Sequence, residues 1–289
     1  MGSVANIPFS VSMCVYKKDH PEHFKQALES VMNQTRKPDE IILVVDGPIS
    51  NSLDDVIKRF ETESSLKVIR LPHNVGHGNA RRIGLDNCTY ELVALMDADD
   101  ICLPDRFEKQ IRCFEQHDQI SIVGGQILEF IDNESNIVGM REVPLHDDEI
   151  KRYLKKRCPF NQMTVMFKLS EVQRAGGYRD WYQNEDYYLW IRMYQGGAEF
   201  MNLEDPLVLV RVGREMYDRR GGWKYFQSEA LLQKLMLNQG IIGIRTFAVN
   251  LGVRFILQVL LPNKLRGYVF KRFARKKVFH HNSGSVLHG

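Results

Sequence analysis

Three aspartates stand within four residues, at Asp97, Asp99 and Asp100, directly after the apolar run Leu92 to Met96. Carboxylates this close repel one another unless a cation or hydrogen-bond donors offset their charge. Hard divalent ions such as Mg²⁺ and Mn²⁺ prefer oxygen ligands, and they share one or two carboxylates with substrate phosphates. The cluster therefore indicates a metal site. The alternative is that Asp99 or Asp100 caps a helix that begins near Pro104.

Two further segments carry groups suited to a phosphorylated ligand. Asp46 follows the apolar run Ile41 to Val45, where its carboxylate can accept a hydrogen bond from a uracil N–H or a ribose hydroxyl. Asn74 to Arg82 is a glycine-containing loop that enters a short helix, and the first backbone N–H groups of a helix favour anions. The alternative for Asp46 is stabilisation of the turn at Gly47. His77 is expected to be a loop side chain rather than a metal ligand.

An acidic pair, Glu185 and Asp186, opens a helix that continues with Tyr187, Tyr188 and Trp190. A carboxylate that aromatic side chains partly shield has a raised pKa and gains useful basicity. Such a group can remove the proton from an attacking hydroxyl. The alternative is that both residues simply favour the N-terminal turn of the helix.

The elements that position these groups alternate between strands and helices. Apolar runs bounded by turn residues predict strands, and helical periodicity predicts helices from near Pro21 and after Pro104. The alternation predicts βαβ units, a mostly parallel sheet and ligands beyond its carboxyl edge. After about residue 140 we expect helices over His146 to Lys156 and Glu185 to Tyr194. The predicted strands are Ser10 to Val15, Ile41 to Val45, Lys67 to Leu71, Leu92 to Met96, Ile120 to Val123, Thr164 to Lys168, Glu199 to Leu203 and Leu207 to Val212.

The order of these motifs resembles glycosyltransferase family 2, whose catalytic domain has the GT-A fold. The resemblance covers roughly residues 8 to 225 and is closest to bacterial members that build O-antigen, capsule and exopolysaccharide repeat units. It rests on SVSMCVY with ALESVMNQT, then EIILVVDGP, NVGHGNARRIGL, MDADD, GGY and NEDYYLW, in this order. The implied fold class is α/β, a GT-A domain with a Rossmann-like, mostly parallel sheet and helices on both faces.

The resemblance also implies a role for each candidate residue. Asp186 is implied as the catalytic base, with Glu185 as its neighbour on the acceptor side. Asp99 and Asp97 are implied as ligands of Mn²⁺ or Mg²⁺, in a family where many members add a histidine that this chain lacks. The residues expected to bind the nucleotide-sugar are Val15, Tyr16, Asp46, Asn74, Arg81, Asp97, Arg219 and Arg220, with Arg82, Arg211 and Arg214 as alternatives for the diphosphate.

The implied activity is inverting, metal-dependent transfer of a hexose from a UDP-sugar to a lipid-linked glycan on undecaprenyl diphosphate. Transfer of a β-glucosyl or β-galactosyl group is the preferred version. A non-catalytic glycan- or membrane-binding protein that keeps the fold is the competing class, and the intact aspartates argue against it. A sugar nucleotidyltransferase is a further rival, but no glycine-rich, Arg-Lys-containing loop stands near the N-terminus to bind a nucleoside triphosphate.

Charge is divided unevenly along the 289 residues. From Ala230 to Gly289 there are ten Lys or Arg and no Asp or Glu, whereas the remaining 229 residues carry 29 basic and 36 acidic groups. Ile241 to Leu261 is apolar apart from polar interruptions that prevent it from spanning a bilayer, and Asn250, Arg254 and Gln258 form one helical stripe. This composition suits a helix in an anionic membrane interface. Packing against the catalytic domain is the main alternative, and no nucleic acid is expected.

The expected domain organisation has three parts. Residues 7–230 form the GT-A catalytic domain, residues 231–279 an amphipathic basic helical tail, and residues 280–289 a disordered end. The five cysteines form no CxxC pair, and no signal-peptide pattern opens the chain. We therefore expect a cytoplasmic protein that is peripheral on the inner face of the cytoplasmic membrane.

Overall fold

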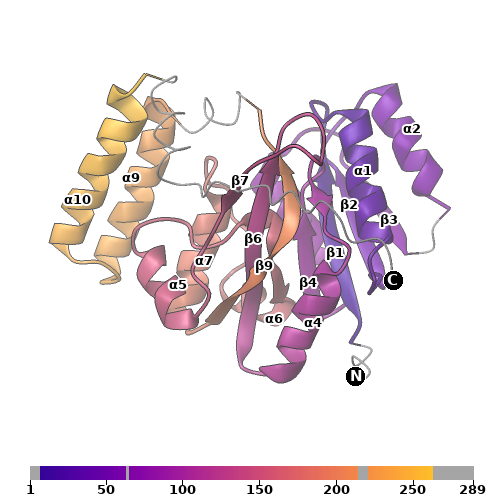
Figure 1. The fold of residues 1–289 in the computed structure, drawn as a ribbon. Coiled ribbons are helices and arrows are strands. Elements are labelled where there is room, and N and C mark those ends of the chain that lie inside the picture. The colour runs from indigo at the N-terminus through magenta and orange to yellow at the C-terminus, as the bar shows by residue number, and fades with distance from the viewer. Residues whose placement is uncertain (1–6, 63–64, 214–220, 263–289) are drawn as a thin grey trace, which may run out of the picture.

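The computed structural model describes residues 7–62, 65–213 and 221–262, and strands and helices alternate strictly from residue 9 to residue 96 (Figure 1). The strands are β1 (Phe9–Val15), β2 (Glu40–Val45), β3 (Leu66–Arg70), β4 (Leu92–Met96), β5 (Ile101–Cys102), β6 (Ile120–Phe130), β7 (Ile137–Arg141), β8 (Met166–Lys168) and β9 (Glu199–Arg211). The α-helices are α1 (Pro21–Met32), α2 (Asn51–Phe60), α3 (His77–Asp86), α4 (Arg106–Gln116), α5 (Asp147–Leu154), α6 (Leu169–Arg174), α7 (Glu185–Gln195), α9 (Trp223–Asn238) and α10 (Ile244–Phe255). A 3₁₀ turn, η1 (Gln162–Thr164), precedes β8, and a π-helical turn, η2 (Ile256–Leu260), extends α10.

One sheet joins these strands in the order β3-β2-β1-β4-β8-β6-β9-β5, with β7 paired to β6. The neighbours among β3, β2, β1 and β4 are parallel, as their crossover helices require. Strand β8 is antiparallel to both β4 and β6, and β6 is parallel to β9. The predicted α/β fold is thus confirmed, with a Rossmann-like parallel half joined to a mixed half.

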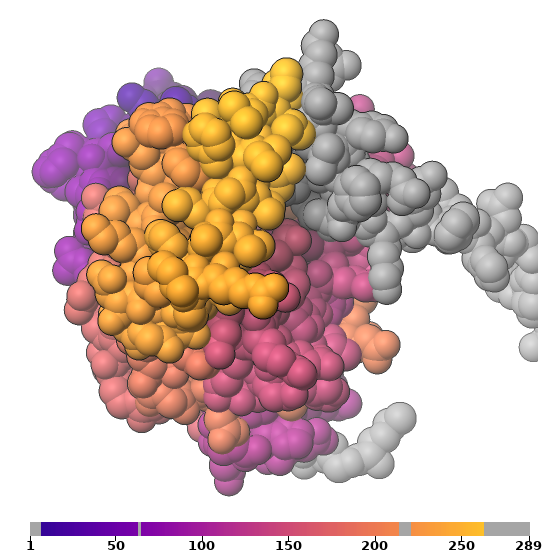
Figure 2. Space-filling model, turned by 90° about the vertical axis from the view of Figure 1, so that its left-hand side faces the viewer, coloured from indigo at the N-terminus to yellow at the C-terminus, as the bar shows by residue number. Residues whose placement is uncertain are grey.

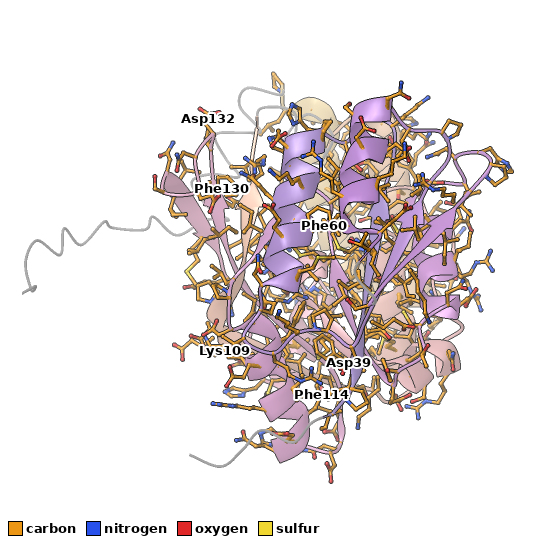
Figure 3. All side chains as sticks on the ribbon, turned by 90° about the vertical axis from the view of Figure 1, so that its right-hand side faces the viewer. Asp39, Phe60, Lys109, Phe114, Phe130 and Asp132 are labelled. Carbon is orange, nitrogen blue, oxygen red and sulfur yellow. The ribbon has the colours of Figure 1, made fainter. Side chains whose placement is uncertain are left out.

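Apolar side chains fill both faces of the sheet. Because side chains alternate along a strand, Ala94 and Met96 of β4 join the core under α1, α2 and α4, whereas Val93 and Leu95 join the core that contains Trp190 of α7. In Figure 3, α1 and α2 stand side by side over the first face. Figure 1 places α5, α7, α9 and α10 toward the other side of the molecule.

The carboxyl ends of the parallel strands can be located in Figure 3 from two labelled residues. In Figure 3, Asp39, which directly precedes β2, lies at the lower end, and Asp132, at the tip of the β6–β7 hairpin, lies at the upper end. The carboxyl ends of the parallel strands therefore point toward the same end as the hairpin tip. This is the end at which ligands bind in open α/β sheets.

Three features of the mixed half differ from the sequence prediction. Strand β6 continues to Phe130 and pairs with β7, which the sequence analysis did not predict. The two strands predicted at 199–203 and 207–212 are one strand, β9. Its pairing with β6 continues through Pro206, which lies opposite Gln126 between two irregularities of register. A proline is tolerated at such a break in the ladder.

The C-terminal helices are packed onto this fold. Leu232 and Met236 of α9 are fully buried in the same core as Trp190, and the predicted domain boundary at residue 230 falls inside α9. No helix in the described part of the chain is long and apolar enough to cross a membrane. The predicted basic tail from residue 263 onward, including the end at 280–289, lies outside the described residues, as do Arg214, Arg219 and Arg220.

Candidate functional site

Asp46 lies where β2 ends, and it orders the loop that precedes α3. Its backbone N–H donates to the Val15 carbonyl at 2.8 Å, which joins the ends of β1 and β2. One carboxylate oxygen accepts the backbone N–H of Val75 and the other accepts the side-chain amide of Asn74, both at 2.7 Å. Gly47 takes a φ of 85°, and a Cβ there would lie 2.6 Å from the Asn74 nitrogen. The predicted residues Asp46 and Asn74 therefore meet, with lone pairs left for a ligand.

Arg81 is buried, and it links the middle of β1 to the end of β4. Its guanidinium donates to the Ser12 carbonyl at 2.9 Å and the Met96 carbonyl at 3.1 Å, and it forms an ion pair with Asp97. Arg82, by contrast, is exposed and lies 3.8 Å from Asp86. The geometry assigns Arg81 to the orientation of Asp97, and the expected contact of Arg81 with a diphosphate stays a prediction.

The other two aspartates of the cluster differ in burial. Asp100 is buried and accepts the backbone N–H of Arg211 at 3.0 Å, which links the end of β4 to the end of β9. Burial, together with the charges of Asp99 and Asp97, holds the pKa of Asp100 well above its ordinary range. Asp99 is exposed, and the predicted alternative of helix capping is not observed, because Asp105 stands at the N-cap of α4. Asp97 and Asp99 thus remain as the carboxylates suited to a metal.

Asp19 is a member of this site that the sequence analysis missed. It lies in the loop after β1 and accepts the backbone N–H of Tyr16 at 2.8 Å. Burial, with smaller contributions from Asp99 and Asp97, raises the pKa of Asp19 to about 7. The position of Asp19 just beyond a strand end was the signal that could have identified it.

The chemistry of these side chains fits a hard divalent cation, although the protein ligands are few. Among the described residues there is no group of three His, Cys, Asp or Glu placed to hold a metal ion. Asp97 and Asp99 carry like charges, which a cation would offset, and both charges add to the effect of burial in raising the pKa of Asp19. Since Mg²⁺ and Mn²⁺ commonly take their remaining ligands from substrate phosphates and water, Asp97 and Asp99 suffice only together with such a ligand.

A second group of residues, at the start of α7, lies against the first turn of α3. The Glu185 carboxylate is 2.5 Å from Nδ1 of His77, and Gly78 leaves room for it, because a Cβ at Gly78 would lie 3.4 Å from Cβ of Glu185. Against the effect of burial, the hydrogen bond and charge of His77 hold the pKa of Glu185 below its ordinary value. His77 is the first residue of α3 rather than the loop side chain that the sequence predicted, and its contact with Glu185 joins the two halves of the site.

Asp186 has the environment of a general base. Burial, and then the neighbouring Glu185 charge, raises its pKa to about 6. One oxygen accepts the backbone N–H of Tyr187 at 2.6 Å, and the other lies 3.6 Å from the Cys158 sulfur. The direction of this pKa shift agrees with the sequence prediction, and the rings of Tyr187 and Trp190 in the same helix are buried. At neutral pH such a group is mostly ionised, and it can still accept a proton efficiently.

Of the arginines expected at or beyond the end of the last strand, Arg211 lies within the described residues, whereas Arg214, Arg219 and Arg220 do not. Its guanidinium stacks on Phe130, 4.6 Å from the ring centroid, and donates to Gln26 at 2.7 Å and to the Asp99 carbonyl at 3.3 Å. Arg211 therefore braces the acidic cluster from the side of β9.

Known proteins resemble this chain in sequence and in fold. The model of glycosyl transferase family 2 matches residues 10–171. An uncharacterized glycosyltransferase of Haemophilus influenzae is 45% identical, over 93% of this chain and 99% of its own. The amylovoran biosynthesis glycosyltransferase AmsE of Erwinia amylovora is 38% identical, over 91% and 98%. The Escherichia coli UDP-Gal:alpha-D-GlcNAc-diphosphoundecaprenol beta-1,3-galactosyltransferase is 35% identical, over 93% and 97%.

Solved structures of low sequence identity share the fold. S. aureus TarS 1–349 in complex with UDP-GlcNAc superposes with a TM-score of 0.62 at 16% identity, covering 86% of this chain and 73% of TarS. The mannosyltransferase PcManGT from Pyrobaculum calidifontis, in complex with GDP-Man and Mn²⁺, gives a TM-score of 0.60 at 15% identity, covering 89% and 71%.

Proposed function

Because this chain belongs to glycosyl transferase family 2 and has the GT-A fold, we propose that it transfers a hexose, with inversion, from a UDP-sugar to a lipid-linked glycan acceptor. The proposed acceptor carries undecaprenyl diphosphate, and the product is a growing surface polysaccharide. The activity of the Escherichia coli relative, a galactosyltransferase that acts on GlcNAc-diphosphoundecaprenol, supports this acceptor class, and the role of AmsE in amylovoran biosynthesis supports a polysaccharide product. A β-galactosyl or β-glucosyl transfer is the preferred version.

The donor side of the proposal uses the carboxyl ends of β1, β2 and β4. Asp46 and Asn74 would hold the uridine, beside Val15 and Tyr16, and the loop before α3 would approach the phosphates. Asp97, which Arg81 orients, and Asp99 would hold Mn²⁺ or Mg²⁺. A bound divalent ion supplies positive charge next to the departing diphosphate. Arg219 and Arg220 remain expectations for the diphosphate.

The acceptor side of the proposal uses the start of α7. Asp186 would take the proton of the attacking hydroxyl as that oxygen bonds to the anomeric carbon and the bond from this carbon to the diphosphate breaks. Attack opposite the leaving group inverts the configuration, so a UDP-α-hexose gives a β-glycoside. Two features support this assignment: burial raises the pKa of Asp186 to about 6, and the neighbouring Glu185 contacts His77 at the start of α3.

A panel of UDP-hexoses, offered with a synthetic lipid diphosphate GlcNAc acceptor and with or without Mn²⁺, tests the proposal. We expect UDP release and a new β-linked product that depends on Mn²⁺ with one of the donors. Proton NMR coupling at the anomeric position identifies the configuration. An α-linked product would overturn the inverting mechanism. Binding of UDP by folded protein without any turnover would instead support the non-catalytic, glycan- or membrane-binding alternative.

The proposed acceptor also places the protein at a membrane. Because undecaprenyl diphosphate is held in a bilayer, we propose peripheral attachment to the inner face of the cytoplasmic membrane. The uneven charge of the sequence supports attachment through the C-terminal segment, which carries ten basic and no acidic residues after Glu229.

A further inference from the structure

Helix α10 and the turn η2 are oriented opposite to an ordinary surface helix, which buries its apolar side. Their polar stripe, Asn250, Arg254 and Gln258, faces the protein and is buried. The Asn250 amide donates to the side-chain oxygen of Gln233 at 2.8 Å. Arg254 forms an ion pair with Glu229 of α9. The helix therefore packs on the catalytic domain through its polar stripe and leaves its apolar side facing outward. Packing and membrane binding, which the sequence analysis treated as alternatives, involve opposite sides of the helix.

The outward side carries a continuous row of aliphatic residues. Val249, Val253, Ile256 and Leu260 follow one another at spacings of four, three and four, which places them on one face of the helix, and each is about half exposed. We call these four residues the aliphatic row. Figure 2 shows α10 and α9, in yellow and orange, as the outermost layer on this face of the molecule. Contiguous exposed apolar residues rimmed by polar ones mark an interaction surface.

The charges that α9, α10 and the following sequence contribute are mostly positive. Lys234 and Arg245 are exposed on α9 and α10. Glu229 is the single acidic residue in the sequence from 221 to 262, and it is paired with Arg254. The chain then continues, in sequence, with seven Lys or Arg between residues 264 and 277 and with no acidic residue to the end. An anionic surface complements this pattern, whereas a second copy of the same basic face would repel it.

We propose that the aliphatic row lies in the interface of an anionic lipid bilayer, with the neighbouring basic residues against the headgroups. In this proposal α10 contacts the bilayer with its apolar side while its polar side stays packed against the rest of the enzyme. This inference deepens the proposed function, because it specifies which face of the transferase meets the membrane that holds its acceptor.

The packing of α10 connects this face to the candidate base. Asn250 donates to the Lys155 carbonyl at 2.9 Å and Arg254 donates to the Lys156 carbonyl at 2.7 Å. Two residues further along, the Cys158 sulfur lies 3.6 Å from the Asp186 carboxylate. A bilayer against α10 would therefore be held at a fixed distance from Asp186, which suits an acceptor whose lipid stays in that bilayer.

Two valines of similar exposure allow a matched test on the full chain. Val253 is 48% exposed in the aliphatic row, and Val138 is 45% exposed on β7. Val253→Glu removes apolar contact and adds a negative charge, so its partitioning onto phosphatidylglycerol-containing vesicles should fall about tenfold. Val138→Glu makes the same chemical change elsewhere and should change partitioning less than twofold. Cosedimentation with vesicles, at low and at high salt, measures both variants.

The proposal predicts that part of the binding of the unchanged protein survives high salt, and that Val253→Glu removes this part. Equal partitioning of the two variants would overturn it. So would a dimer in analytical ultracentrifugation that Val253→Glu dissociates while vesicle binding stays intact, because the row would then be a contact between copies. UDP release with a soluble acceptor should be the same in both variants. If the unchanged protein and both variants lacked turnover but bound vesicles as predicted, the proposed function would be refuted and the membrane proposal would stand.

Discussion

Acidification from pH 7 to pH 5 should separate a general base at Asp186 from an ordinary carboxylate. With a pKa of about 6, roughly ten elevenths of Asp186 is ionised at pH 7 and about one eleventh at pH 5. A base acts in its ionised form, so kcat/KM should fall about tenfold as the pH falls through this interval. A carboxyl group at its ordinary pKa of 3.8 would lose under about a tenth of its ionised form over the same interval.

Initial rates of UDP release with donor, acceptor and fixed Mn²⁺ give kcat/KM at each pH. Histidines titrate in the same range, and His77 contacts Glu185 beside the base, so the measurement needs a His77→Gln control. Gln keeps a hydrogen-bond donor for Glu185 and does not titrate. Calorimetry of UDP binding at both pH values separates a loss of donor binding from a loss of the base. A change in kcat/KM of less than twofold, or a dependence that disappears in His77→Gln, would refute the assignment.

Three further predictions follow from the site. Asp186→Asn should lower transfer about 10² to 10⁴-fold with UDP binding unchanged in calorimetry. The pKa of Asp186 is higher in the folded than in the unfolded protein, so ionisation of Asp186 destabilises the fold. The free energy of unfolding in urea should therefore be about 1 to 3 kcal/mol higher for the Asn variant at pH 8, and this difference should vanish below pH 4. Asp99→Ala should abolish Mn²⁺-dependent UDP release and leave the circular dichroism spectrum unchanged, whereas Asp55→Ala, at an exposed position, should leave UDP release unchanged. Undiminished UDP release by Asp99→Ala would exclude a metal role for Asp99. Arg81→Met should lower the free energy of unfolding in urea by about 3 kcal/mol, because it removes the ion pair with Asp97 and the hydrogen bonds to the Ser12 and Met96 carbonyls. Exposed Arg82→Met should change it by less than about 0.5 kcal/mol.

The parallel half of the fold was predictable because β1, β2 and β4 are buried on both faces. Leu92–Met96 is an uninterrupted apolar run, and β4 has these same bounds. In the mixed half, Asp205 and Pro206 resemble a turn in sequence, yet they lie inside β9. Only the pairing with β6, which tolerates an irregular register there, decides that the strand continues. Local propensity does not contain that information.

The side chains of the site were predictable one at a time, but their partners were not. The position of Asp46 and Asp97 after apolar runs located them at the binding edge of the sheet. The contact between His77 and Glu185 joins residues 108 positions apart, and the bond from Arg211 to Asp100 joins residues 111 positions apart. Such contacts depend on how β9 and α7 pack, so single-sequence reasoning placed His77 in a loop and did not find its role.

The strand order has a consequence for the chain while it is still being synthesised. Strands β1 to β4 can pair as soon as they leave the ribosome, but β4 needs β8 on its other edge, roughly 70 residues later. At a synthesis rate of about 5 to 20 residues per second, this edge of β4 stays unpaired for several seconds before β8 is made. An unpaired apolar strand edge is a template for pairing with other chains. The nascent chain, rather than the finished enzyme, is therefore the form of this protein most exposed to aggregation.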